Sequence, residues 1–257
     1  MIMGRLRQGN IAVGNFFFRH RNALFPVLFV CAALVGRPRL MFGDPGLDRL
    51  LGICGIVVAL TGQAVRLITI GYEYIERGGK EGKVYASRLV QGGVYALTRN
   101  PMYVGNGLIA IGMTMLAGSP LIYLVVLPFF LFVYQALVAA EEAYLRKQFG
   151  LEYDRYCARV SRWWPRWPRI GPALSGLSYD WRQAIRKELS TMAGLFTGIV
   201  LLPLLRTYFL EGLEAARAQA PRAGMLELSG LAVYGLLVYL KRKRRLFYAP
   251  PNPPSAC

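Results

Sequence analysis

The chain has 257 residues, of which 54% are hydrophobic and only 18% are charged. This composition is more apolar than that of an average soluble domain, so the lipid bilayer is the expected solvent. The formal net charge is +17. Because the Lys and Arg residues lie between long apolar runs and do not line one soluble groove, we expect anionic lipid headgroups, and not nucleic acid, as their partners.

Six apolar runs follow one another along the chain. They are residues 23–36, 50–70, 102–117, 120–140, 191–210 and 226–240. The first, third and sixth runs are shorter than the roughly 20 residues that a spanning helix needs, so each must borrow flanking residues or be re-entrant. The expected fold is therefore all-α, a polytopic bundle of about six membrane helices.

The basic residues alternate between the loops in a way that predicts an orientation. Residues 1–22 contain four Lys or Arg, residues 71–101 five, residues 141–190 ten and residues 241–257 five. The loops of the opposite side contain only Arg37, Arg39, Arg49, Arg217 and Arg222. Since cytoplasmic loops collect Lys and Arg, both termini are expected to be cytoplasmic.

Only Gly118 and Ser119 separate the third and fourth runs, which predicts a tight antiparallel hairpin. Both open ends of this hairpin would lie at the cytoplasmic face. Residues 141–160 then mix charged with aromatic side chains, and Trp-Pro pairs follow at Trp164 and Trp167. This pattern predicts an interfacial helix and a tryptophan anchor along the headgroups.

The segment before the third run has the pattern of a helix start at the membrane surface. Asn100 is a good N-cap residue, and Pro101 is a good first helical residue. The free backbone N–H groups of such a start favour a carboxylate or a phosphate, and Arg99 adds a positive charge beside them. One turn further in, Gly105 and Gly107 allow a ligand or a neighbouring helix to approach closely.

Two acids, Glu141 and Glu142, follow the fourth run directly. A helix C-terminus disfavours negative charge, so we expect a cation to compensate them. Arg99, Arg146 or Lys147 would do this in an ordinary interfacial ion pair. The hairpin, however, brings the acids and the positive helix start to the same membrane depth. Together they predict a site for a zwitterionic ligand.

Several short motifs occur here in a fixed order. They are Gly93-Val94-Tyr95, Arg99-Asn100-Pro101-Met102-Tyr103-Val104-Gly105, Glu141-Glu142, Leu145, Phe149-Gly150, Tyr153 and Tyr156. These motifs and their spacing resemble the core of the isoprenylcysteine carboxyl methyltransferase and phospholipid methyltransferase superfamily, over residues 66–168. The resemblance implies that S-adenosylmethionine binds from the cytoplasm and that a lipid-like methyl acceptor enters from the bilayer.

The resemblance also implies roles for individual residues. The cofactor-binding residues would be Tyr95, Arg99, Asn100, Pro101, Tyr103, Gly105, Glu141, Glu142 and Tyr153. Glu142 and Arg99 would be the catalytic residues. Asn100 stands where eukaryotic members of the family usually have His, and an amide does not titrate near neutral pH, so acid–base work is not expected there. No metal is expected, because methyl transfer from a sulfonium mainly requires alignment and exclusion of water.

The methyl acceptor and the role of Arg66 stay open. A carboxylate acceptor needs a nearby cation such as Arg66, Arg99 or Arg159, whereas an amine headgroup needs a carboxylate base such as Glu142. Arg66 lies inside the second apolar run near its cytoplasmic end. An intramembrane charge is a functional candidate by default, but a snorkelling side chain explains it equally well.

Two other classes of function remain alternatives. Membrane sterol reductases have a similar core but use NADPH, whose extra phosphate would suit the basic loop at residues 77–88. A non-catalytic lipid-binding protein would tolerate substitution of both acids. The expected division of the chain is residues 1–65 for the N-terminal membrane helices, 66–170 for the methyltransferase core, and 171–257 for a connector, a C-terminal helical hairpin and a disordered tail.

Overall fold

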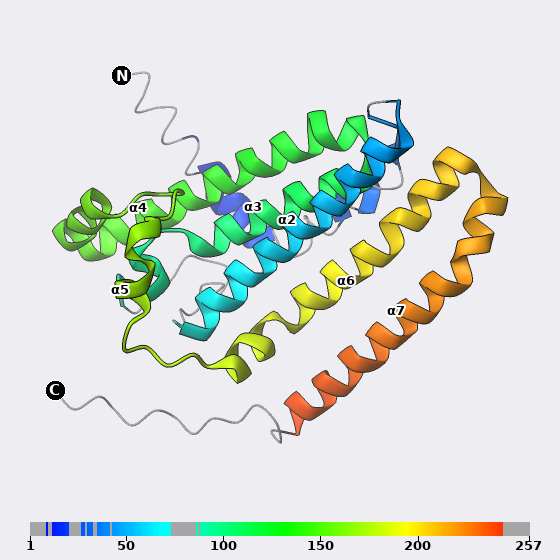
Figure 1. Ribbon diagram of the computed structural model, residues 1–257. Helices are drawn as coiled ribbons and strands as arrows, with labels where there is room; N and C mark the ends of the chain where they lie inside the picture. The colour runs from blue at the N-terminus through cyan, green and yellow to red at the C-terminus, as the bar shows by residue number, and fades with distance from the viewer. Residues whose placement is uncertain are drawn as a thin grey trace.

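The computed structural model describes residues 9, 12–20, 27–28, 30–32, 35–41, 43–72, 86 and 88–243. Every regular element in these ranges is helical, which confirms the expected all-α fold. The labelled α-helices are α2 (Pro45–Tyr72), α3 (Pro101–Ala117), α4 (Leu127–Arg159), α5 (Ile170–Leu174), α6 (Trp181–Glu211) and α7 (Leu213–Arg242). Residues 12–20 are also helical, and a π-helical segment, Ile122–Val126, leads into α4. The five long helices lie side by side along a common direction, with α7 at one edge (Figure 1).

Within the described residues, four helical segments are long and apolar enough to cross a membrane: α2, the segment Ile122–Arg159, α6 and α7. Helix α3 is apolar but shorter, as the third run predicted. The first predicted helix, residues 23–36, lies partly outside the described residues, and so do the basic loop at residues 77–88 and the predicted tail. The number of six membrane helices therefore stays a prediction.

Two described pieces near the N-terminus lie along α4. Phe18 packs against Val133 and Leu137 of that helix. Ala32 packs against Ile122 in the helical turn that leads into α4. The chain therefore passes from the middle of α4 toward its beginning, antiparallel to α4.

Glycine allows α2 and α3 to form the closest helix pair of the bundle. A Cβ atom added at Gly62 would lie 2.6 Å from the carbonyl oxygen of Gly105, and one added at Gly55 would lie 2.6 Å from the carbonyl oxygen of Gly112. The two backbones therefore touch without side chains between them. Membrane helices commonly gain their van der Waals contact in this way.

The tight hairpin between α3 and α4 is confirmed. Gly118 follows α3 in the left-handed conformation, with φ +61°, and its N–H donates to the Thr114 carbonyl at 3.2 Å. Glycine adopts this conformation without the steric cost that a Cβ atom would add. Ser119 is buried in the turn, and the chain reverses there as the two-residue spacing predicted.

The expectation that the fourth helix ends at the acids is wrong. Helix α4 continues through Glu141 and Glu142, because the residues that follow the apolar run are strong helix formers. The helix breaks at Gly150, with φ +52° and ψ −127°. Arg146 before the break donates from Nε to Oδ1 of Asp154 after it, at 2.7 Å. This pair holds the short final piece of α4 against the long one.

Helix α6 begins ten residues before the apolar run that predicted it, so most of the expected connector is helical. Its N-cap, Asp180, accepts a hydrogen bond from the Gln183 N–H at 2.9 Å. Helix α7 packs back on α6, and Thr197 donates to Glu227 between them at 2.6 Å. The C-terminal hairpin predicted from the last two runs is therefore present.

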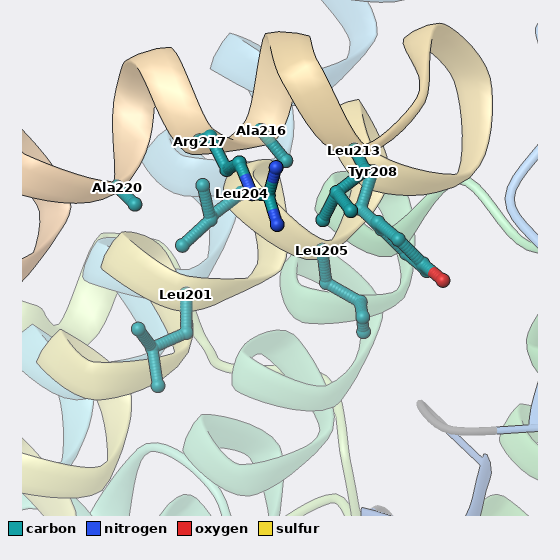
Figure 2. A pocket seen from close by; sticks show the side chains of 8 residues that line it. All are labelled: Leu201, Leu204, Leu205, Tyr208, Leu213, Ala216, Arg217 and Ala220. Atoms are coloured by element: carbon teal, nitrogen blue, oxygen red, sulfur yellow. The ribbon is translucent and has the colours of Figure 1, made fainter.

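A shallow apolar hollow of about 320 Å³ lies between α6 and α7, near the turn that joins them (Figure 2). It is lined by Leu201, Leu204, Leu205, Tyr208, Leu213, Ala216, Arg217 and Ala220. The predicted site residues lie at the other end of the bundle, where α2 ends and α3 begins (Figure 1).

Candidate functional site

Two loops that are distant in sequence pair at one end of the bundle, just before α3 and just after α4. The Arg99 N–H donates to the Ser161 carbonyl at 2.9 Å, and the Arg166 N–H donates to the Leu97 carbonyl at 3.1 Å. These backbone bonds fix the loop before α3 against the loop after α4. They therefore set where the side chains of both loops can reach.

Side chains strengthen this pairing at the carbonyl of Arg162. Thr98 donates to it from Oγ1 at 3.1 Å, and Asn100 donates from Nδ2 at 3.2 Å. Asn100 is the N-cap residue and Pro101 begins α3, as predicted, but the Asn100 side chain makes no capping hydrogen bond. The Asn100 amide thus fastens the two loops together.

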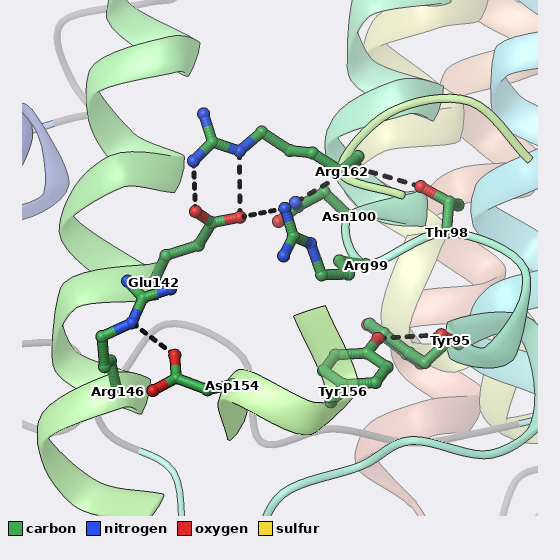
Figure 3. A network of polar contacts seen from close by, with 9 residues as sticks. All are labelled: Tyr95, Thr98, Arg99, Asn100, Glu142, Arg146, Asp154, Tyr156 and Arg162. Atoms are coloured by element: carbon green, nitrogen blue, oxygen red, sulfur yellow. Dashed lines mark hydrogen bonds and ion pairs between the residues drawn. The ribbon is translucent and has the colours of Figure 1, made fainter. Parts of the chain in front are cut away.

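Glu142 is the centre of the polar network (Figure 3). Its Oε1 lies 3.3 Å from Nη2 of Arg99 and accepts from Nε of Arg162 at 3.0 Å, while Oε2 pairs with Nη2 of Arg162. The carboxylate side chain is only 7% exposed. A guanidinium fork on a carboxylate is a strong, directional contact. Because two guanidinium groups share one acid, positive charge is in excess at this point.

Arg99 also has a donor that its neighbours leave unused. Its Nε is buried and has no hydrogen-bond partner. Buried polar groups in folded proteins are nearly always paired, so an unpaired donor needs an explanation. The start of α3 adds further positive potential beside it. An anionic ligand group would pair with the Arg99 Nε and would be stabilised by the positive potential at the start of α3.

Glu141 faces the same helix from α4. The Tyr103 hydroxyl donates to Oε1 of Glu141 at 2.6 Å, and the Tyr103 ring packs edge-on against Tyr134, with ring centroids 5.2 Å apart. Both acids therefore point toward the first turn of α3. The expected compensation by Arg99 is confirmed at Glu142, whereas Arg146 pairs with Asp154 instead.

Two of the predicted tyrosines lie where the final piece of α4 packs on the loop before α3. The Tyr156 hydroxyl donates to the Tyr95 carbonyl at 2.8 Å. Tyr153 is almost completely buried and packs with Tyr156 and Val160. Both residues follow the break in α4, so this break places them against the loop before α3.

Gly105 and Gly107 have different surroundings. A Cβ atom at Gly105 would meet Cγ of Arg66 at 2.6 Å, so this glycine makes room for α2. No heavy atom lies within 4 Å of a Cβ atom built at Gly107. Of the two predicted uses of Gly105, close helix packing is present. A cofactor contact there remains a prediction.

The sequence that forms most of this site matches a known protein family. The family described as phospholipid methyltransferase matches residues 51–152, which include α3, Arg99 and both acids. Residues 51–152 belong to the phospholipid methyltransferase family. Membership confirms the resemblance read from the motifs and makes the protein a membrane methyltransferase that acts on a lipid-like substrate.

Two relatives share parts of the chain. An uncharacterized protein of Haemophilus influenzae is 42% identical over 62 residues, which are 24% of this chain and 98% of that protein. The cobalt-zinc-cadmium resistance protein CzcN of Cupriavidus metallidurans is 28% identical over 159 residues, which are 60% of this chain and 68% of that protein. No solved structure matches.

Arg162 lies beyond the stretch that matches the phospholipid methyltransferase family, and sequence reasoning missed it. It is one of many arginines in a basic segment, and no spacing distinguishes it from its neighbours. Arg159, which the sequence offered as a cation for the acceptor, donates to Gln91 at 3.0 Å instead. Only the pairing of the two loops reveals that Arg162 reaches Glu142.

Arg66 also has an unexpected role within the methyltransferase core. Its side chain is 9% exposed and donates from Nε to Oε2 of Glu188 on α6 at 2.7 Å. Arg66 is therefore paired inside the bundle and does not snorkel to the surface.

Proposed function

We propose that this protein transfers a methyl group from S-adenosylmethionine to a lipid-like acceptor at the cytoplasmic face of the membrane. The observation that carries the proposal is the cluster at the start of α3, where Arg99 and Arg162 share Glu142 and the Arg99 Nε is buried and unpaired. When bound, S-adenosylmethionine supplies an electrophilic methyl group on a sulfonium.

The residues present fit this cofactor. The unpaired Arg99 Nε and the N–H groups at the start of α3 suit its carboxylate. Glu141 supplies the negative charge that its ammonium group needs, while Glu142 holds the two arginines in place. The ring of Tyr103, held by Glu141, offers an aromatic face for the sulfonium. Asn100 and Pro101 fix the loop and the helix start that present these groups.

The remaining predicted cofactor residues would act as supports and walls. The Tyr95 carbonyl accepts a hydrogen bond from the Tyr156 hydroxyl, and this bond holds the loop before Arg99 in place. Tyr153 excludes water beneath that loop, because its ring is almost completely buried. Gly105 lets α2 approach α3, so that the start of α3 is packed on a second side.

Two classes of acceptor fit the site. An amine acceptor would give a proton to Glu142, but both oxygens of this acid already accept from guanidinium groups, so one arginine must first move. A carboxylate acceptor needs a cation and no proton transfer, and Arg162, the more exposed of the two arginines, supplies that cation. We therefore favour a carboxylate acceptor, with Arg99 and Glu142 as the catalytic residues.

Incubation of the purified protein with methyl-labelled S-adenosylmethionine tests this function. One arm contains membrane lipid extract, and the other contains prenylcysteine analogues. We expect label in a lipid-soluble, base-labile ester, which is the product of a carboxylate acceptor; label in an amine headgroup would instead assign the amine class.

Thermal stabilisation separates the alternatives at the level of the cofactor. A ligand that binds only the folded protein raises the midpoint of unfolding. S-Adenosylmethionine should stabilise the protein and NADPH should not. Stabilisation by NADPH alone would assign a reductase, and stabilisation by neither, together with no labelled product, would contradict the proposal.

A further inference from the structure

Two buried ion pairs join α6 to α2, one near each end of the helix pair. Arg66 of α2 pairs with Glu188 of α6, and Asp48 of α2 pairs with Arg206 of α6. The two charged positions are 18 residues apart in both helices, which is five helical turns, so they lie on one face of each helix. At one end α2 carries the positive charge and α6 the negative charge, and at the other end the charges are exchanged. Such a pattern fixes the register of two antiparallel helices.

We call Arg66–Glu188 the inner pair and Asp48–Arg206 the outer pair. The inner pair also contacts α3. Arg66 donates from Nη2 to Oε1 of Glu188 at 2.9 Å, and its Nη1 is paired with Oδ1 of Asn106. Gln63 adds a hydrogen bond from Nε2 to Oε2 of Glu188 at 3.2 Å. Glu188 is completely buried. Helices α2, α3 and α6 therefore meet at the Arg66 guanidinium.

The outer pair meets the opposite end of α3. A Cβ atom built at Gly118, which follows α3, would lie 3.0 Å from Cζ of Arg206. The inner pair instead reaches Asn106, which lies about two helical turns from Arg99. The two pairs thus join the same helices, but only the inner one lies near the cluster around Glu142.

Stability alone is a poor explanation for these pairs. Burying two charges costs so much desolvation energy that apolar residues of similar volume are often equally stabilising. What an ion pair adds is geometry, because an arginine donates both hydrogen bonds to a carboxylate in only a few orientations. The inner pair therefore fixes the rotation of Arg66, and with it the position of Asn106 and the beginning of α3.

We propose that Glu188, in the hairpin outside the family match, is a positioning residue for the methyltransferase site. Through Arg66 and Asn106 it holds the start of α3 so that Arg99 lies opposite Glu142. This inference rests on the proposed function. It gives the C-terminal hairpin a role in cofactor binding, although α6 contributes no residue to the cluster itself.

The outer pair provides a matched control for the experiment. Glu188→Gln and Asp48→Asn each remove one acid from a buried pair between the same two helices, so both should lower the thermal midpoint. Asn106→Leu removes the hydrogen bond between Arg66 and α3 while leaving the Arg66–Glu188 pair intact. This variant replaces Glu188→Gln in the test if Glu188→Gln fails to fold. All variants are prepared as full-length protein in lipid nanodiscs.

Two readouts test the proposal. We expect Glu188→Gln and Asn106→Leu to weaken S-adenosylmethionine binding about tenfold, as small misplacements of binding groups do, and Asp48→Asn to leave it unchanged. Hydrogen exchange should also accelerate at the first turns of α3 in the first two variants and not in Asp48→Asn. The proposal would be overturned if Glu188→Gln and Asp48→Asn had equal effects on binding and exchange. It would also be overturned if Glu188→Gln and Asn106→Leu had no effect.

The two readouts also separate this inference from the proposed function. If the wild-type protein does not bind S-adenosylmethionine, the proposed function fails. Hydrogen exchange still decides whether Glu188 positions the start of α3, because that measurement needs no cofactor. Faster exchange restricted to the first turns of α3 supports the positioning role, and unchanged exchange there contradicts it.

Discussion

At Glu142, two arginines from different loops converge on one buried carboxylate. Arg99 precedes α3, and Arg162 follows α4. The acid therefore links the two sides of the hairpin, in addition to any contact with a ligand. Loss of either arginine should disturb the cluster, but in different ways, because Arg99 alone also carries the unpaired buried donor.

Arg162→Gln tests the residue that the sequence did not single out. Glu142 keeps Arg99 in this variant but loses its bidentate partner, so its carboxylate is no longer held in one orientation. We expect the affinity for S-adenosylmethionine to fall about tenfold, because small misplacements of binding groups are costly. The measurement is calorimetric titration in nanodiscs. Arg166→Gln is the control, since that side chain is exposed; an equal loss in both variants would contradict a specific role for Arg162.

Sequence reasoning located Arg99 and the two acids because each has a local signal. Arg99 stands beside a helix start, and the acids follow an apolar run directly. Arg162 has no such signal, because its role depends on backbone pairing between loops about 60 residues apart in the chain. Residues that act through tertiary contacts of this kind cannot be read from spacing.

Among the elements, α4 depends on an unusual backbone at Gly150. The positive φ there disfavours any residue with a Cβ atom, although no atom lies within 4 Å of the position that a Cβ would occupy. The cost of a substitution at Gly150 is therefore backbone strain and not a steric clash. This break places Tyr153 and Tyr156 against the loop before α3.

Gly150→Ala should lower the free energy of unfolding by about 1–3 kcal/mol, the usual cost of a strained backbone conformation. Denaturant titration followed by circular dichroism measures the change. Gly107→Ala is the control: this position is helical and open, so alanine should be neutral or slightly stabilising there. Equal stability of the two variants would show that Gly150 is not strained.

The contact between α2 and α3 makes a different prediction. A Cβ atom at Gly62 would lie 2.6 Å from a backbone oxygen of α3, which cannot move without separating the helices. We expect Gly62→Ala to destabilise the protein by about 1–3 kcal/mol through overpacking. Gly194→Ala in α6, where nothing lies within 4 Å, should not destabilise it. Thermal unfolding in detergent distinguishes these outcomes.

The apolar runs predicted which segments are helical, because burial in a bilayer requires continuous apolar helices. Their ends were less predictable. Helix α6 begins at an N-cap, Asp180, outside the apolar run, and α4 continues past Glu141 through polar helix formers. Hydropathy marks the part of a helix that contacts lipid, whereas capping and propensity decide where the helix stops.

At the scale of the whole molecule, the site end of the bundle carries most of the basic residues. The positive-inside rule therefore predicts that this end lies in the cytoplasm. Single cysteines in a variant without the native cysteines test the orientation. Trp164→Cys should react with an impermeant maleimide only in inside-out vesicles, and Glu214→Cys, at the opposite end, only from outside. The reverse pattern would contradict the orientation.

The docking of α6 on the core was not predictable from the sequence. Arg66 and Glu188 are 122 residues apart, and each alone reads as an ordinary charge near a membrane boundary. The equal spacing of the two ion pairs becomes informative only once α2 and α6 are known to be neighbours. The pattern of apolar segments thus gives the elements of the bundle, while their neighbours depend on contacts that the pattern does not encode.

The central claim is that the cluster around Glu142 binds S-adenosylmethionine. Calorimetric titration of this compound into wild-type protein and Glu142→Gln, with Glu152→Gln on the exposed face as the control, tests it most directly. Saturable binding to the wild type and the control is expected, with at least about a tenfold loss in Glu142→Gln, because truncating one partner of a buried charge pair is costly. Equal affinity in all three proteins, or no binding to the wild type, would contradict the claim.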